Sequence, residues 1–210
     1  GPTIIEEAQS KFKTALKNPS QAVRHIDFRG KTFSNAAEFA NVMQPAIDPL
    51  GETLRVVFTK KEGSKERILG IEETSYNIHA MTNNTNYPNK AGSFLYEYGD
   101  FIARKAKALG ADYVYEMHNH PGSSEPSGSY GGNDDLGSST DFKKAINRGM
   151  QTEGYNFKFG GGLVIGYDGY SFYGGGNRTG FKNTARKEGV YTSRGRRDNQ
   201  QRRICSSAVC

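Results

Sequence analysis

Apolar residues recur three and four positions apart in four stretches of the chain, the spacing that gathers side chains on one face of a helix. The first stretch follows a capping-box pattern of Thr3 and Glu6. The second is opened by Asn35 and ended by Pro45 and Pro49. The pattern predicts four helices, with their apolar positions within residues 8–16, 39–43, 94–109 and 141–150.

Runs rich in β-branched and aromatic residues between these stretches indicate strands over residues 25–28, 54–59, 67–71, 113–118, 162–167 and 170–173. The polar segment 60–66 and the dipeptide Asp168-Gly169 predict two hairpins. Residues 122–137 contain five Gly and four Ser, which predicts a loop. This order of elements predicts an α/β fold, with a mixed β-sheet flanked by helices.

The chain has 210 residues, enough for one domain with a hydrophobic core. No run approaches the roughly 20 apolar residues that span a bilayer, and no charged and then apolar leader begins the chain. Gly1-Pro2 resembles the remnant of a cleaved tag, so a targeting signal ahead of it would have been removed. The localisation therefore cannot be predicted from this end.

The net charge of +6 is concentrated near the C-terminus. Residues 178–203 hold nine Lys or Arg and two Asp or Glu, so the rest of the chain is close to neutral. A segment so polar predicts a solvated, flexible tail over residues 177–210; the alternative is a contact with nucleic acid or an anionic membrane surface. Cys205 and Cys210 form neither a disulfide framework nor a zinc site by their spacing, and we assign them no catalytic role.

His118 and His120 end one of the predicted strands. Side chains two positions apart in a strand point to the same side, so both imidazoles can reach one ion. Two imidazoles and one carboxylate are a usual set of ligands for catalytic zinc, and Asp141, at the start of the next predicted helix, is the best third ligand. The alternatives are a surface His pair, and a capping box of Ser138 and Asp141.

The string His118-Asn119-His120-Pro121, a glycine loop and then Ser138-x-x-Asp141 resembles the motif of the JAMM zinc metalloproteases, also called MPN+ or JAB. RadC-like members are the most similar. The resemblance covers roughly residues 34 to 173 and implies a JAB/MPN-like, cytidine-deaminase-like architecture for a catalytic domain over residues 34–176. Residues 1–33 would then be an N-terminal extension with one helix.

The spacer before Ser138 departs from the motif, and the catalytic glutamate can be assigned to more than one residue. Sixteen residues separate Pro121 from Ser138, more than is usual in the family, so Asp134 and Asp135 are competing ligands. The resemblance also implies a catalytic glutamate on an earlier strand. Glu52 occupies that place, with Glu72 or Glu73 as the alternatives.

The resemblance implies a zinc-dependent hydrolase that cleaves a peptide or isopeptide amide bond. Zinc would lower the pKa of a bound water toward about 7, Glu52 would accept its proton, and Ser138 would stabilise the oxyanion. The expected partner is a protein or peptide substrate. The alternatives are a RadC-like nucleic-acid-associated protein and a non-catalytic MPN-like interaction module.

The chain also resembles the JAB-like toxin domains at the C-termini of bacterial polymorphic toxins. That resemblance implies an effector secreted by a bacterium and acting inside a target cell, with an immunity protein as a further partner. Without it, the expected location is cytoplasmic.

Overall fold

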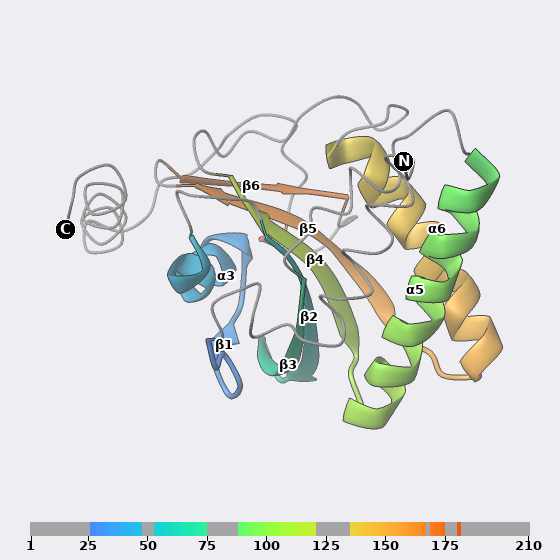
Figure 1. The fold of residues 1–210 in the computed structure, drawn as a ribbon. Coiled ribbons are helices and arrows are strands. Elements are labelled where there is room, and N and C mark those ends of the chain that lie inside the picture. Colours follow the sequence, from blue (N-terminus) through green and yellow to red (C-terminus); the bar gives the residue numbers. More distant parts are fainter. Residues whose placement is uncertain are drawn as a thin grey trace.

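The computed structural model describes residues 26–47, 53–74, 88–120, 135–166, 169–174 and 180–181, with the backbone alone for 74, 88–98 and 135–141. In the described part, a six-stranded mixed sheet has the strand order β1-β3-β2-β4-β5-β6. Helices α5 and α6 cover one face of the sheet, here called the helix-pair face, and α3 covers the other, the α3 face (Figure 1). The α/β class predicted from the sequence is confirmed.

Several sequence predictions fall outside these residues: the helix over residues 8–16, Glu52 and the basic tail after Phe181. Among the described helices, none is both long and apolar enough to cross a membrane.

The first predicted hairpin is confirmed, with strands β2 (Leu54–Glu62) and β3 (Lys65–Thr74). Both strands run further than the sequence predicted, because the turn needs only two residues, and Gly63 supplies its positive φ of 63°. A bulge at Leu69 separates the Phe58–Gly70 pair from the Thr59–Ile68 pair.

The strand predicted over residues 25–28 is wrong for residues 26–28, which are in no regular element. Asp27 Oδ1 accepts a hydrogen bond from the backbone N–H of Arg29 at 3.0 Å, which bends the chain into a turn, and Gly30 follows with φ 82°. Strand β1 (Thr32–Phe33) therefore begins only after the turn and pairs antiparallel with Glu66 and Arg67 of β3.

The second half of the sheet is built around a strand–helix–strand unit. Strand β4 (Tyr113–Asn119) pairs antiparallel with β2 and parallel with β5 (Lys158–Gly166), and α6 (Asp135–Glu153) connects β4 to β5. Strand β6 (Gly169–Tyr173) completes the predicted second hairpin. A helix that links parallel strands begins at the end of the sheet where the first strand ends, and α6 accordingly starts at the end of the sheet toward which β4 runs (Figure 1).

Helix α6 begins at Asp135, earlier than the sequence predicted, so residues 135–137 belong to the helix and not to the glycine loop. Phe142, Ala145 and Ile146 pack into the core and hold the middle of the helix. Once a helix is nucleated, each added residue gains a hydrogen bond at little further cost, which lets it extend through residues of low propensity. Ser138 is therefore inside the helix, and the capping-box alternative is wrong.

The remaining helices follow the predicted pattern. Helix α3 (Ala36–Met43) is capped by Asn35, whose Oδ1 accepts from the N–H of Glu38 at 2.9 Å, and the 3-10 turn η1 (Gln44–Ala46) follows it. Helix α5 (Pro88–Leu109) ends before Gly110, which has φ 70°. Phe181, from the segment assigned to the tail, is buried against Phe172 on the α3 face.

Candidate functional site

Strand β4 divides its side chains between the two faces of the sheet. Val114 packs in the core of the helix-pair face, whereas Tyr115 and Met117 pack in that of the α3 face. Alternation along the strand therefore places Glu116 and His118 on the helix-pair face. His118 is 1% exposed, so it is an interior residue at the end of its strand.

The side chains of His118 and His120 lie close together, as the sequence predicted. His118 Nε2 and His120 Nε2 lie 3.1 Å apart, and the ring centroids are 4.9 Å apart. His120 lies just after the end of β4 but is still hydrogen bonded to β5, because its N–H donates to the carbonyl of Ile165 at 2.8 Å. The Nε2–Nε2 separation fits a shared metal, since two zinc–nitrogen bonds of about 2.0–2.1 Å at a tetrahedral angle place their nitrogens roughly 3.3 Å apart.

Asn119 faces away from the histidine pair and ties β4 to the start of β2. Its Oδ1 accepts a hydrogen bond from the backbone N–H of Thr53 at 2.9 Å, and both residues are buried. In the next row of the sheet, Leu54 pairs directly with His118. The chain that enters β2 is thus fixed against the end of β4, a contact that no sequence signal indicated.

Helix α6 brings its first turns to the same end of the sheet. Asp141 is four positions before Ala145, and Ser138 is four positions before Phe142. Ala145 and Phe142 are both buried in the core between the helices and the sheet. Because positions four apart share a helix face, Ser138 and Asp141 lie on the backbone stripe that continues into the residues buried between α5, α6 and the sheet.

The alternative bases lie away from the histidine pair. Glu72, on the helix-pair face of β3, forms an ion pair with Lys105 Nζ of α5. Glu73 is buried on the α3 face, where Arg55 Nε lies 3.4 Å from its Oε1. Of the competing ligands, Asp134 lies outside the described residues and Asp135 is the first residue of α6.

Among the residues whose side chains are described, no three His, Cys, Asp or Glu converge as metal ligands. The side chains of Asp141 and Glu52 are not in that set.

No family model matches the chain, and no curated protein matches it.

Sequence reasoning missed Glu116, the interior carboxyl on the same strand face as His118. The signal that could have found it is the spacing Glu116-x-His118-x-His120, which puts three polar side chains at alternate positions of a strand that otherwise carries core residues. Glu116 is 1% exposed. A polar group buried so deeply is costly unless it is hydrogen bonded, which makes it a candidate for a role at the site.

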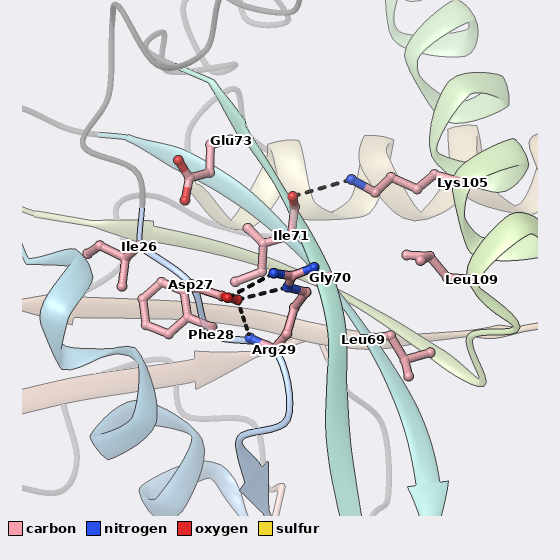
Figure 2. A pocket seen from close by; sticks show the side chains of 10 residues that line it. All are labelled: Ile26, Asp27, Phe28, Arg29, Leu69, Gly70, Ile71, Glu73, Lys105 and Leu109. Carbon is pink, nitrogen blue, oxygen red and sulfur yellow. Dashed lines mark hydrogen bonds and ion pairs between the residues drawn. The ribbon is translucent and has the colours of Figure 1, made fainter.

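A pocket of about 570 Å³ lies elsewhere, along the outer edge of β3 (Figure 2). Its charged groups have local partners: Arg29 Nη2 lies 2.9 Å from Asp27 Oδ2, and Lys105 Nζ donates to the carbonyl of Ile71 at 3.3 Å. The hydrogen bond from the Arg29 side chain lowers the pKa of Asp27 to about 2. Neither histidine lines this pocket, so it is separate from the histidine pair.

Proposed function

We propose that the chain is a JAMM-type zinc hydrolase that cleaves a peptide or isopeptide amide bond. The observation that carries the proposal is the pair of Nε2 atoms of His118 and His120, 3.1 Å apart at the end of β4. Such a separation suits two ligands of one tetrahedral ion. The position is also where α/β sheets usually bind ligands, at the carboxyl end of a parallel strand pair.

Asp141 is proposed as the third ligand. Its backbone lies in the first turns of α6, at the end of the sheet where β4 ends, and four positions before the buried Ala145. A carboxylate there would complete a set of two imidazoles and one carboxylate, and leave a fourth position for water or substrate.

Glu52 is proposed as the general base. It immediately precedes Thr53 in the sequence, and the N–H of Thr53 donates a hydrogen bond to Asn119, the residue between the two histidines. The two alternative bases form ion pairs with other side chains: Glu72 with Lys105, and Glu73 with Arg55.

The chemistry follows from these roles. When bound, zinc would polarise the scissile carbonyl and lower the pKa of a water toward about 7. Glu52 would accept the proton of the attacking water and return it to the leaving amine nitrogen. Ser138 would donate a hydrogen bond to the oxyanion, which stabilises such a charge by about 3 kcal/mol.

The test is hydrolysis by Glu52→Gln, because the amide keeps the size of the side chain but cannot accept the proton. The probes are a library of internally quenched peptides and a fluorogenic amide at the C-terminus of a ubiquitin-like protein. Relative to the original chain, the rate should fall about 10²-fold to 10⁴-fold while the bound zinc is unchanged.

Glu72→Gln is the matched control, since it changes a carboxylate that is paired with Lys105, and its rate should stay close to that of the original chain. Full activity in Glu52→Gln would contradict the assignment of the base. The absence of hydrolysis of both probes by the zinc-loaded original chain would contradict the proposed activity.

A further inference from the structure

Asn119 is a buried amide between the two histidines in the sequence, and its side chain lies on the other face of the sheet. Alternation along β4 puts it on the α3 face with Met117, away from the ring of His118. It is 0% exposed, and its Oδ1 accepts a hydrogen bond from the backbone N–H of Thr53 at 2.9 Å. Asn119 therefore holds the start of β2 and is not a ligand of the proposed metal.

This hydrogen bond takes the place of a backbone hydrogen bond between β2 and β4. The N–H of Asp112 donates to the carbonyl of Thr59, so the backbone groups of Thr59 face β4. Every second residue of an antiparallel strand shares that orientation, which extends to Thr53, one residue before the strand. A continued ladder would bond the N–H of Thr53 to the backbone carbonyl of Asn119. The side-chain oxygen of the same residue accepts it instead.

The N–H that Asn119 binds belongs to the peptide group that joins Glu52 to Thr53. A peptide group is planar and includes the Cα atoms of both residues, so a hydrogen bond to its N–H restrains the whole unit. Thr53 is buried as well, and a buried N–H that loses its acceptor cannot turn to water without cost. The amide of Asn119 thus fixes the backbone directly beside the proposed general base.

We propose that Asn119 is a positioning residue for Glu52: it holds the peptide group between Glu52 and Thr53 against the end of β4, where the proposed metal ligands lie. One side chain then links the strand that carries the histidines to the segment that carries the base. A general base must stay within hydrogen-bond reach of the water, and a misplacement of about 1 Å can cost about 10²-fold in rate. The catalytic role of Asn119 rests on the proposed function, whereas its hydrogen bond to Thr53 does not.

The first experiment measures amide hydrogen exchange by NMR in zinc-free protein. Exchange at the N–H of Thr53 should be slow in the original chain and about 10-fold or more faster in Asn119→Ala, because the acceptor is lost. Asn119→Asp should keep it slow, since a carboxyl oxygen can still accept. The N–H of His120, which donates to the carbonyl of Ile165, is the internal control and should be unchanged. Equal exchange at Thr53 in Asn119→Ala and the original chain would overturn the proposal.

The second experiment measures hydrolysis of the same two probes. Asn119→Ala should lower kcat about 10-fold to 100-fold, while KM and the bound zinc stay unchanged, because neither a substrate contact nor a metal ligand is removed. Asn119→Asp should return kcat to within about 10-fold of the original value. An unchanged kcat in Asn119→Ala, or the loss of its zinc, would overturn the positioning role. If Asn119→Ala does not fold, Asn119→Leu, which leaves a smaller cavity, is the variant with the same expected result.

The matched control is Tyr155→Phe, which removes another side chain–backbone hydrogen bond. The Tyr155 hydroxyl donates to the carbonyl of Ala111 at 2.7 Å, near the start of β4 and thus at the opposite end of the strand from His118. Its kcat should stay close to that of the original chain. An equal fall of kcat in Tyr155→Phe would assign the effect to general destabilisation and overturn the proposal. If the original chain hydrolyses neither probe, the proposed function fails and the catalytic role of Asn119 with it, while slow exchange at Thr53 would still establish the hydrogen bond.

Discussion

Two buried glutamates, Glu66 and Glu116, lie on opposite faces of the sheet and have different surroundings. Glu66, on the α3 face, accepts hydrogen bonds from Thr59 Oγ1 at 2.7 Å and from the Tyr115 hydroxyl at 2.6 Å. Its role is to satisfy polar groups within an aromatic core. Glu116 is buried to a similar degree but shares its strand face with His118, one of the two proposed zinc-binding histidines.

The role of Glu66 leads to a prediction about stability. Tyr115→Phe removes one donor to Glu66 Oε1 while leaving the ring in the core, so the carboxyl loses a hydrogen bond that water cannot replace. The free energy of unfolding should fall by about 1–3 kcal/mol. Denaturant titration measures it, with the exposed Thr152→Ala as the control expected within about 0.5 kcal/mol. Equal stability of Tyr115→Phe and the original chain would contradict the interior role of Glu66.

At this scale, the sequence predicted the His118–His120 contact because strand alternation alone determines it. Glu116 was missed because an alternating pattern does not tell whether a charged side chain faces water or the interior. That depends on α5 and α6, which cover the face, and on the ring of Tyr173 over Gly162.

Most helices and strands were predictable because their apolar periodicity matches the faces that they bury. The exceptions have local causes. The turn at Asp27 to Gly30 replaces a predicted strand, because a side chain–backbone hydrogen bond competes with strand pairing. The early start of α6 was hidden by its Gly and Ser content, since packing further along the helix outweighs propensity.

The crossing of α5 and α6 is the element contact on which the position of Asp141 depends. A Cβ on Gly99 of α5 would lie 2.4 Å from the carbonyl oxygen of Ala145, and one on Gly149 of α6 would lie 2.5 Å from that of Gly99. These contacts are with backbone atoms, which cannot rotate away. The two helices therefore approach as closely as they do only because both positions are glycine.

Gly99→Ala should accordingly destabilise the protein, although alanine favours a helix by about 1 kcal/mol relative to glycine. Overpacking at a tight contact costs typically about 1–3 kcal/mol, and more where backbone must move. Thermal melting should show a lower midpoint for Gly99→Ala. Asn147→Ala, at an exposed position of α6, is the control and should be neutral or slightly stabilising. A rise in the midpoint of Gly99→Ala would show that the helices are not in close contact.

For the whole molecule, the sequence predicted the class but not the strand order. The parallel pairing of β4 with β5 beside antiparallel neighbours arises from contacts between distant segments, which periodicity does not record. Nor did it predict that Phe181 is buried beyond the end of β6. This topology is what brings the end of β4, the start of β2 and the first turns of α6 to one end of the sheet.

Metal binding at that end of the sheet is the central proposal, and the zinc content of the purified chain, measured by elemental analysis, tests it most directly. We predict about one zinc per molecule for the original chain and for Glu66→Gln. His118→Ala, His120→Ala and Asp141→Ala should each hold far less, because each removes one of the three proposed protein ligands. A zinc-free original chain, or equal zinc in all of these proteins, would contradict the proposed site.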